Sequence, residues 1–80
     1  MPEVFREDGY RFFFFSLEGT EPPHIHVESA EKYAKFWLTP IALVESRRMN
    51  SAELTKVRKI IEKRRDEIIT RWNEYFGLNG

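Results

Sequence analysis

Two histidines, His24 and His26, are the only histidines of the chain and lie two positions apart between Pro22 and Val27. The intervening and following residues, Ile25 and Val27, are typical of a β-strand, and in a strand this spacing places both imidazoles on one face. Imidazoles can ligate a divalent metal ion or transfer protons near neutral pH. A pair alone completes neither kind of site, so other residues must supply the remaining groups.

A metal site is one alternative. Glu28 shares the predicted strand face with the two histidines, and two imidazoles with a carboxylate resemble the ligands of open metal sites. These three residues extend over about 13 Å of strand, which is too far for all of them to bind one ion. A divalent metal at His24 and His26 would therefore need a donor from elsewhere, and the leading expectation is that the chain has no cofactor.

Acid–base chemistry on RNA is another alternative. One histidine would remove a proton and the other would return it, while Arg11 and Lys35 would stabilise the charged phosphate. The simpler interpretation is structural: the imidazoles hydrogen-bond to neighbouring strands or form a polar edge surface. An RNA-directed toxin or ribonuclease that uses His24 and His26 stays an alternative function, and a non-enzymatic protein is preferred.

Aromatic and basic residues suggest a further surface. Binding of single-stranded nucleic acid without catalysis requires rings for base stacking and cations for phosphates on one sheet face. The candidates are Tyr10, Tyr33, Trp37, Arg11 and Lys35. The four consecutive phenylalanines, Phe12 to Phe15, are more typical of a core than of a stacking surface.

Composition limits the class of protein. Eighty residues with 41% hydrophobic residues predict one folded domain, residues 1–80, whose small core favours oligomerisation or a partner. The absence of cysteine fits a reducing compartment. The chain has no apolar run near the roughly 20 residues needed to span a bilayer, and Met1-Pro2-Glu3 does not begin a signal peptide. We therefore expect a soluble, cytoplasmic protein without membrane contact.

The formal charge of zero conceals an asymmetry. Residues 1–46 contain four Lys/Arg and eight Asp/Glu, whereas residues 47–80 contain nine Lys/Arg and five Asp/Glu. The two parts can attract each other, attract further copies, or present a basic surface to nucleic acid.

The predicted elements form an α+β domain: a small antiparallel β-meander of about four strands in residues 1–46, packed against one long C-terminal helix in residues 50–76. Asp8-Gly9 indicates a hairpin turn between the first two strands. The strands are expected at Val4–Glu7, Tyr10–Ser16, His24–Ser29 and Tyr33–Thr39. Residues Ile41–Val44 are compatible with a fifth strand or a helical turn.

The helix has clear boundaries. Asn50 with Glu53 forms a predicted capping box, and Gly77 is a natural stop. Residues 51–76 would form a helix of about 39 Å, against about 23 Å for a seven-residue strand, so the helix should extend beyond the sheet. Its last turns carry a surplus of apolar residues that would contact a second subunit or partner. These residues are Ile68, Ile69, Trp72, Tyr75 and Phe76.

Several segments resemble one family. They are Phe5-Arg6, Gly9 to Phe14, Ser16, Glu18-Gly19, Glu21 to Val27, Ala34 to Leu38, Pro40 and Trp72 to Phe76. In order and extent the chain is similar to small bacterial proteins grouped as domain of unknown function family 4160. The resemblance implies no activity and no catalytic residues. It does imply a small protein partner, because members are often encoded beside another small protein, as in toxin–antitoxin pairs.

The leading hypothesis is therefore a small cytoplasmic bacterial interaction protein. It would form a dimer or other homo-oligomer, or bind a small partner protein in a toxin–antitoxin-like pair. The RNA-directed and metal-binding alternatives remain open, and nucleic acid stays a candidate partner.

Overall fold

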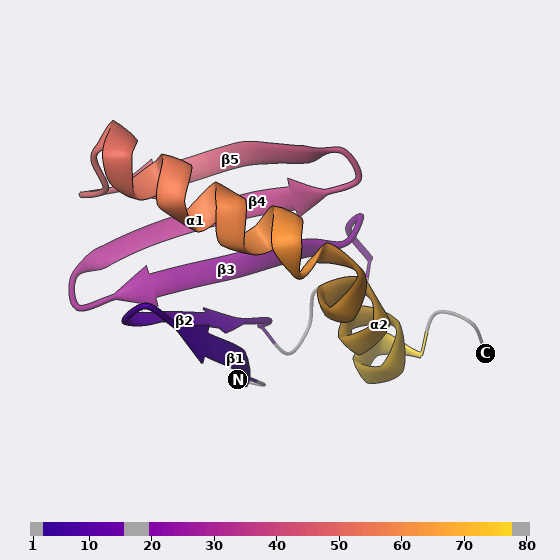
Figure 1. Cartoon of the computed structure of the whole chain (residues 1–80). Coiled ribbons are helices and arrows are strands. Elements are labelled where there is room, and N and C mark those ends of the chain that lie inside the picture. The colour runs from indigo at the N-terminus through magenta and orange to yellow at the C-terminus, as the bar shows by residue number, and fades with distance from the viewer. Residues whose placement is uncertain (1–2, 16–19, 78–80) are drawn as a thin grey trace.

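Five antiparallel strands form one sheet in the computed structural model, which describes residues 3–15 and 20–77 (Figure 1). Each strand pairs with the next strand of the chain, so the order β1-β2-β3-β4-β5 is a meander. The strands are β1 (Glu3–Glu7), β2 (Tyr10–Phe13), β3 (His24–Ser29), β4 (Lys32–Leu38) and β5 (Ile41–Arg47). The predicted α+β class and meander are confirmed, and the prediction of about four strands is corrected to five.

The first hairpin follows its sequence signal. Asp8 and Gly9 have φ angles of 55° and 84°, the left-handed conformation that a two-residue hairpin turn requires at both positions. β2 is shorter than predicted, because it ends at Phe13 while Phe14 and Phe15 continue outside the strand. Ser16, the predicted end, lies outside the described residues.

The segment after Pro40 is a strand and not a helical turn. Thr39 and Pro40 reverse the chain, and Leu38 lies opposite Ile41, so β5 returns alongside β4. The register shifts between Lys35 and Phe36, which marks a bulge in this pair of strands. The strand continues to Arg47, three residues beyond the segment whose structure the sequence left open.

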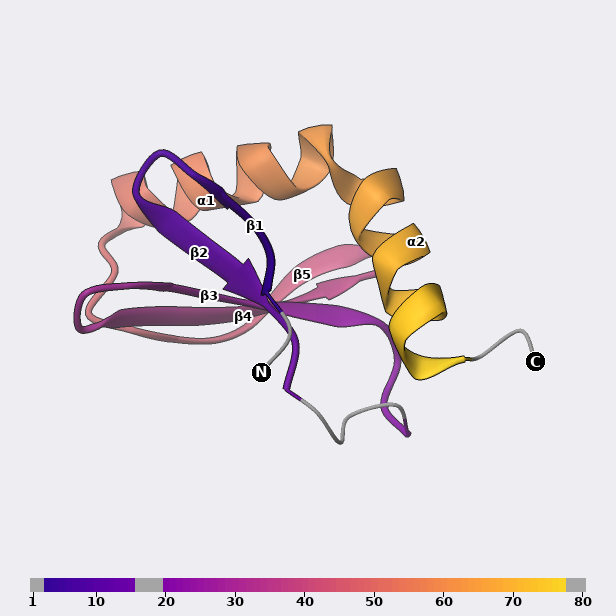
Figure 2. The ribbon, with the colours of Figure 1, turned by 90° about the horizontal axis from the view of Figure 1, so that it is seen from below.

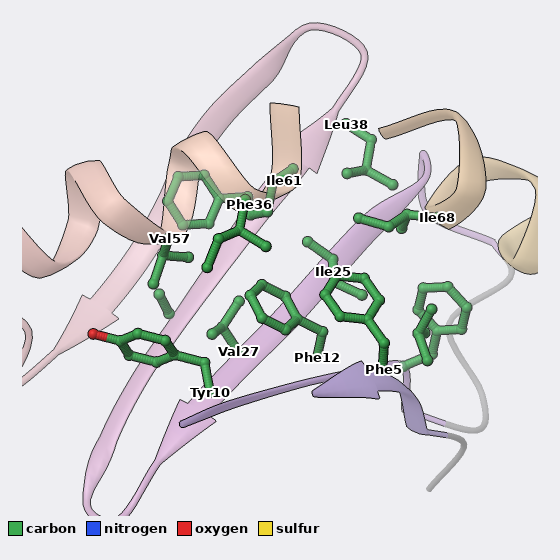
Figure 3. Packing of buried hydrophobic residues seen from close by; sticks show 14 of the residues in the cluster. Phe5, Tyr10, Phe12, Ile25, Val27, Phe36, Leu38, Val57, Ile61 and Ile68 are labelled. Atoms are coloured by element: carbon green, nitrogen blue, oxygen red, sulfur yellow. The ribbon is translucent and has the colours of Figure 1, made fainter. Parts of the chain in front are cut away.

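The register assigns side chains to two faces. On one face, Phe12 lies opposite Val27, and Val27 lies opposite Ala34. All three are buried, and Figure 3 shows Phe12 and Val27 beneath Val57 of the first helix, within the main hydrophobic cluster. On the other face, Phe13, His26 and Lys35 lie opposite one another. The main core therefore lies between the sheet and the helical layer.

The predicted single helix is wrong, because the chain forms α1 (Ser51–Lys63) and α2 (Arg65–Phe76). The capping box at Asn50 and Glu53 and the left-handed stop at Gly77 are confirmed. Seen from below, α1 lies along the sheet, and α2 turns around its end (Figure 2). The bend at Arg64 replaces the predicted overhang.

Side chains of β1 contact the residues at this bend. Glu7, at the end of β1, accepts hydrogen bonds from Lys63 Nζ (2.8 Å) and Arg64 Nη1 (3.1 Å). The Arg64 guanidinium also lies 3.6 Å from the ring centroid of Phe5. The hydrogen bond from Lys63, assisted by Arg64, lowers the pKa of Glu7 below its ordinary value. These contacts favour a turn of the helical layer toward the β1 edge.

Glu53 connects the start of α1 to the sheet and predicts a pH dependence. Its carboxylate accepts hydrogen bonds from Lys32 Nζ (2.5 Å) and from the backbone N–H of Asn50 (3.3 Å). The Lys32 hydrogen bond keeps the pKa of Glu53 below its usual 4.5. This stabilisation is complete above pH 4.5 and is lost as the pH falls through the lowered folded-state pKa.

Glu53→Gln should therefore lower the free energy of unfolding at pH 7, and the difference from wild type should shrink as the pH falls below 4.5. Urea unfolding at a series of pH values measures this difference. Glu74→Gln, at an exposed position of α2, is the control. A Glu53→Gln difference that stays constant from pH 7 to pH 3 would contradict this role of the ion pair.

Candidate functional site

The histidine pair lies in the middle strand of the sheet and is buried. His26 Nδ1 and the Tyr33 hydroxyl share a hydrogen bond of 2.7 Å, and His24 Nδ1 lies 2.9 Å from the carbonyl oxygen of Pro22, to which it donates. Aromatic rings surround both imidazoles: Phe15 lies 4.2 Å from His26, and Trp72 lies 4.9 Å from His24, between ring centroids. The predicted shared face is correct, whereas a polar edge surface is not.

Arg11 and Lys35 lie on the same sheet face as the two histidines, as the acid–base alternative requires. Each cation already has carboxylate partners, however. Arg11 pairs with Glu28 and, at 3.2 Å, with Glu3. Lys35 Nζ lies 3.1 Å from Glu21. Compensated cations beside buried imidazoles provide no accessible site for a phosphate, so this geometry gives the ribonuclease alternative no support.

The metal alternative gains no ligand cluster in the part of the chain that the structure describes. Among residues 3–15 and 20–77, no three His, Cys, Asp or Glu side chains are grouped so that they could hold one ion. Glu28, the third residue on the predicted strand face, is engaged with Arg11.

The sheet face opposite α1, to which Phe13, His26 and Lys35 belong, is called the open face. It carries three cation–aromatic pairs among the described residues. The guanidinium of Arg11 lies 4.4 Å from the ring centroid of Phe13, and Lys35 Nζ lies 5.0 Å from that of Trp37. The third pair joins Arg47 to Tyr33 at 4.6 Å. Tyr33 and Trp37 thus share a face with Arg11 and Lys35, as predicted.

Tyr10, the fifth member of the predicted stacking surface, is buried in the main core on the other face. A groove of about 610 Å³ crosses the open face, with Phe13, Phe15 and Tyr33 among its lining residues. Its rim carries both signs of charge, and Arg48 pairs with Glu31 at 3.2 Å. Such a balanced surface lacks the excess of cations typical of nucleic-acid interfaces.

The predicted interaction surface at the helix end is mostly internal. Ile68 and Trp72 are fully buried, because α2 turns onto the end of the sheet. The Trp72 ring lies 5.2 Å from Phe14 and 4.2 Å from Phe76. Ile69 and Phe76 are partly buried against the core. Only Tyr75 of this set is largely exposed, at 46%.

The outer edge of β5 is a candidate site that the sequence analysis missed. β5 is the last strand of the sheet, pairs only with β4, and has no strand beyond it among the described residues (Figure 1). Leu43 and Val44 are 43% and 39% exposed on this strand. No clear sequence signal marks it, because the apolar segment Ile41–Val44 is too short to distinguish a strand from a helical turn and polar residues follow it.

The opposite edge is less available. β1 has five residues, and its apolar side chains, Val4 and Phe5, are buried. A short strand offers few backbone groups to an added strand. β5 has seven residues and two exposed apolar side chains. The β5 edge is therefore the stronger candidate for binding a strand.

A family model matches the chain. The model described as a domain of unknown function, DUF4160, matches residues 9–73, which is most of the chain. The chain belongs to the DUF4160 family. The matched region of this DUF4160 chain contains β2 to β5, α1 and most of α2. Comparisons with curated proteins and with solved structures found no match. No helix in the described part of this DUF4160 domain is long and apolar enough to cross a membrane.

Proposed function

We propose that this DUF4160 chain is a non-enzymatic interaction protein that self-associates or binds a second small protein by strand addition at the β5 edge. The observation that carries the proposal is the outer side of β5, where a seven-residue strand with exposed Leu43 and Val44 has no neighbouring strand among the described residues. An added strand would satisfy the outward backbone groups and cover apolar surface.

A groove beside the strand supports the same mode of binding. It has a volume of about 230 Å³ and lies between β5 and α1, with Phe36, Leu43 and Leu54 among its lining residues. In strand addition, backbone hydrogen bonds supply affinity, and pockets beside the edge select side chains. An apolar side chain of the added strand suits this groove. A small partner encoded nearby, as in toxin–antitoxin-like pairs, belongs to the same proposal.

Backbone directions identify the position at which to test this proposal. Leu38 donates its backbone N–H to Pro23 on the β3 side. The backbone N–H and C=O groups of successive residues point to opposite sides of β4, so those of Ala34 point toward β3, as the N–H of Leu38 does. Ser46 lies opposite Ala34, and its own backbone N–H and C=O therefore point away from β4. Ser46→Pro therefore removes an outward donor without removing a β4–β5 hydrogen bond.

Immobilised wild-type chain should capture free chain or a small protein from a cell extract, whereas Ser46→Pro should not. Ser46→Ala retains the backbone donor and should bind like wild type. Val44→Lys, a second edge variant, should also lose binding because it places a charge on the strand. Circular dichroism verifies that each variant is folded. Equal capture by all four proteins would contradict binding at β5.

A further inference from the structure

The bend between α1 and α2 lies in a segment that favours a continuous helix. Residues 51–76 contain neither glycine nor proline, and residues 63–65 are Lys and Arg, which are good helix formers. The backbone N–H of Arg64 donates to the carbonyl oxygen of Ile60 (3.1 Å), and the carbonyl oxygen of Arg64 accepts from the N–H of Ile68 (3.0 Å). Hydrogen bonds of the helical type therefore reach Arg64 from both sides.

Two consecutive arginines connect the bend to different strands of the sheet. Arg64 reaches β1, where its guanidinium donates a hydrogen bond to Glu7. Arg65 reaches the end of β4, where its Nε donates to the carbonyl oxygen of Leu38 (2.7 Å) and its Nη2 donates to the Thr39 hydroxyl (3.1 Å). β2 and β3 lie between these two strands. The two side chains thus attach the bend to the sheet at two separate places.

A straight helix would remove α2 from the end of its own sheet, onto which it now turns (Figure 2). The side of α2 that carries Ile68 and Trp72, both fully buried, would then be exposed. The surface around Phe14 and His24 would also be exposed, because the Trp72 ring now lies 5.2 Å and 4.9 Å from these rings. Exposed apolar surfaces favour association. Each of these two surfaces has its matching side chains on a second copy of the chain.

We infer that α2 is an exchangeable element, which Arg64 and Arg65 hold on its own sheet and which two copies of this chain exchange when these contacts are lost. In the exchanged form, residues 51–76 would make one helix of about 39 Å, and each α2 would pack on the sheet of the other copy. Both forms bury the same apolar surfaces, so the contacts at the bend and the protein concentration decide between them. This exchange is independent of strand addition at β5.

Cross-linking distinguishes the two forms, because the natural chain contains no cysteine. Glu3 of β1 and Glu74 of α2 line one groove, and Glu3→Cys with Glu74→Cys would be introduced into every protein tested. A short bismaleimide would then join the two thiols within one chain in the closed form and between two chains in the exchanged form. Each protein would be unfolded in urea and refolded over a concentration series. Denaturing electrophoresis shows how many chains are linked, and light scattering gives the mass.

Removal of the contacts at the bend should favour exchange. The parent should give cross-links mainly within one chain. Glu7→Ala combined with Arg65→Ala should raise the fraction of two-chain cross-links about tenfold at equal concentration, with a mass approaching twice the 9.6 kDa of one chain. Arg58→Ala is the matched control, because Arg58 lies in α1 and contacts Ile41 and not the bend, and it should behave like the parent. Circular dichroism verifies folding, and each single variant is tested in case the double variant does not fold.

The outcomes separate exchange of α2 from strand addition. Cross-links that stay within one chain in every folded variant would overturn the exchange, and so would an equal rise in two-chain cross-links in Arg58→Ala. Ser46→Pro, added to the variants at the bend, should leave the two-chain cross-links unchanged. A dimer that Ser46→Pro abolishes, and whose cross-links lie within one chain, would support strand addition at β5 and reject exchange as its cause.

Discussion

Trp72→Ala should lower the free energy of unfolding by about 3–5 kcal/mol, the usual cost of removing a large buried aromatic side chain. Trp72 is fully buried and lies among the rings of Phe14, His24 and Phe76. Its loss would leave a cavity where α2 packs onto the end of the sheet. Urea denaturation followed by circular dichroism gives the difference.

Tyr75→Ala, three residues further along α2, is the matched control. Tyr75 is 46% exposed, so the same kind of truncation should cost about 1 kcal/mol or less. Similar small losses for both variants would mean that α2 is not packed as described. The apolar residues at the end of α2 would then again be candidates for an interaction surface. A large loss for Trp72→Ala alone would also mean that this variant cannot serve as a probe of binding, because it changes the fold itself.

Phe12→Ala should have a comparable effect, about 3–5 kcal/mol, because Phe12 is fully buried in the core between the sheet and α1. Its ring stacks on Phe5 with centroids 4.5 Å apart, and Figure 3 shows it beside Val27 and Ile25. Removal of the ring would therefore weaken contacts on several strands at once. Chemical denaturation measures this loss, and a decrease in thermal stability should accompany it.

The same run of phenylalanines contains the control. Phe15 is 37% exposed and lies on the open-face side, next to His26. Phe15→Ala should therefore cost much less than Phe12→Ala, about 1 kcal/mol. If Phe15→Ala lowered the free energy of unfolding as much as Phe12→Ala, Phe15 would have to be buried by a further surface that covers the open face. The comparison thus tests which of two nearby identical residues belongs to the main core.

The active-site alternatives show how burial changes the interpretation of a motif. Spacing correctly placed His24 and His26 on one face with Arg11 and Lys35. The spacing could not indicate that Phe15, Tyr33 and Trp72 would lie against the imidazoles, or that Glu21 and Glu28 would pair with the cations. These groups come from different elements, and only the fold brings them together.

Local signals predicted local structure well. Asp8-Gly9 predicted the first hairpin, Asn50 with Glu53 predicted the start of α1, and Gly77 predicted the end of α2. Each signal depends on backbone angles or hydrogen bonds within a few residues, so no distant contact is needed to establish it. The family resemblance was confirmed for the same reason, because it rests on residue types and their order.

The sequence by itself therefore determined the α+β class, the meander and the caps, through turn residues and apolar periodicity. The tertiary structure decided the bend at Arg64, which has neither glycine nor proline and where Arg64 contacts Glu7 of the N-terminal strand. It also decided that Trp72 is internal and that β5 is an open edge. Burial and edge position depend on which elements pack together, and long-range contacts decide that packing.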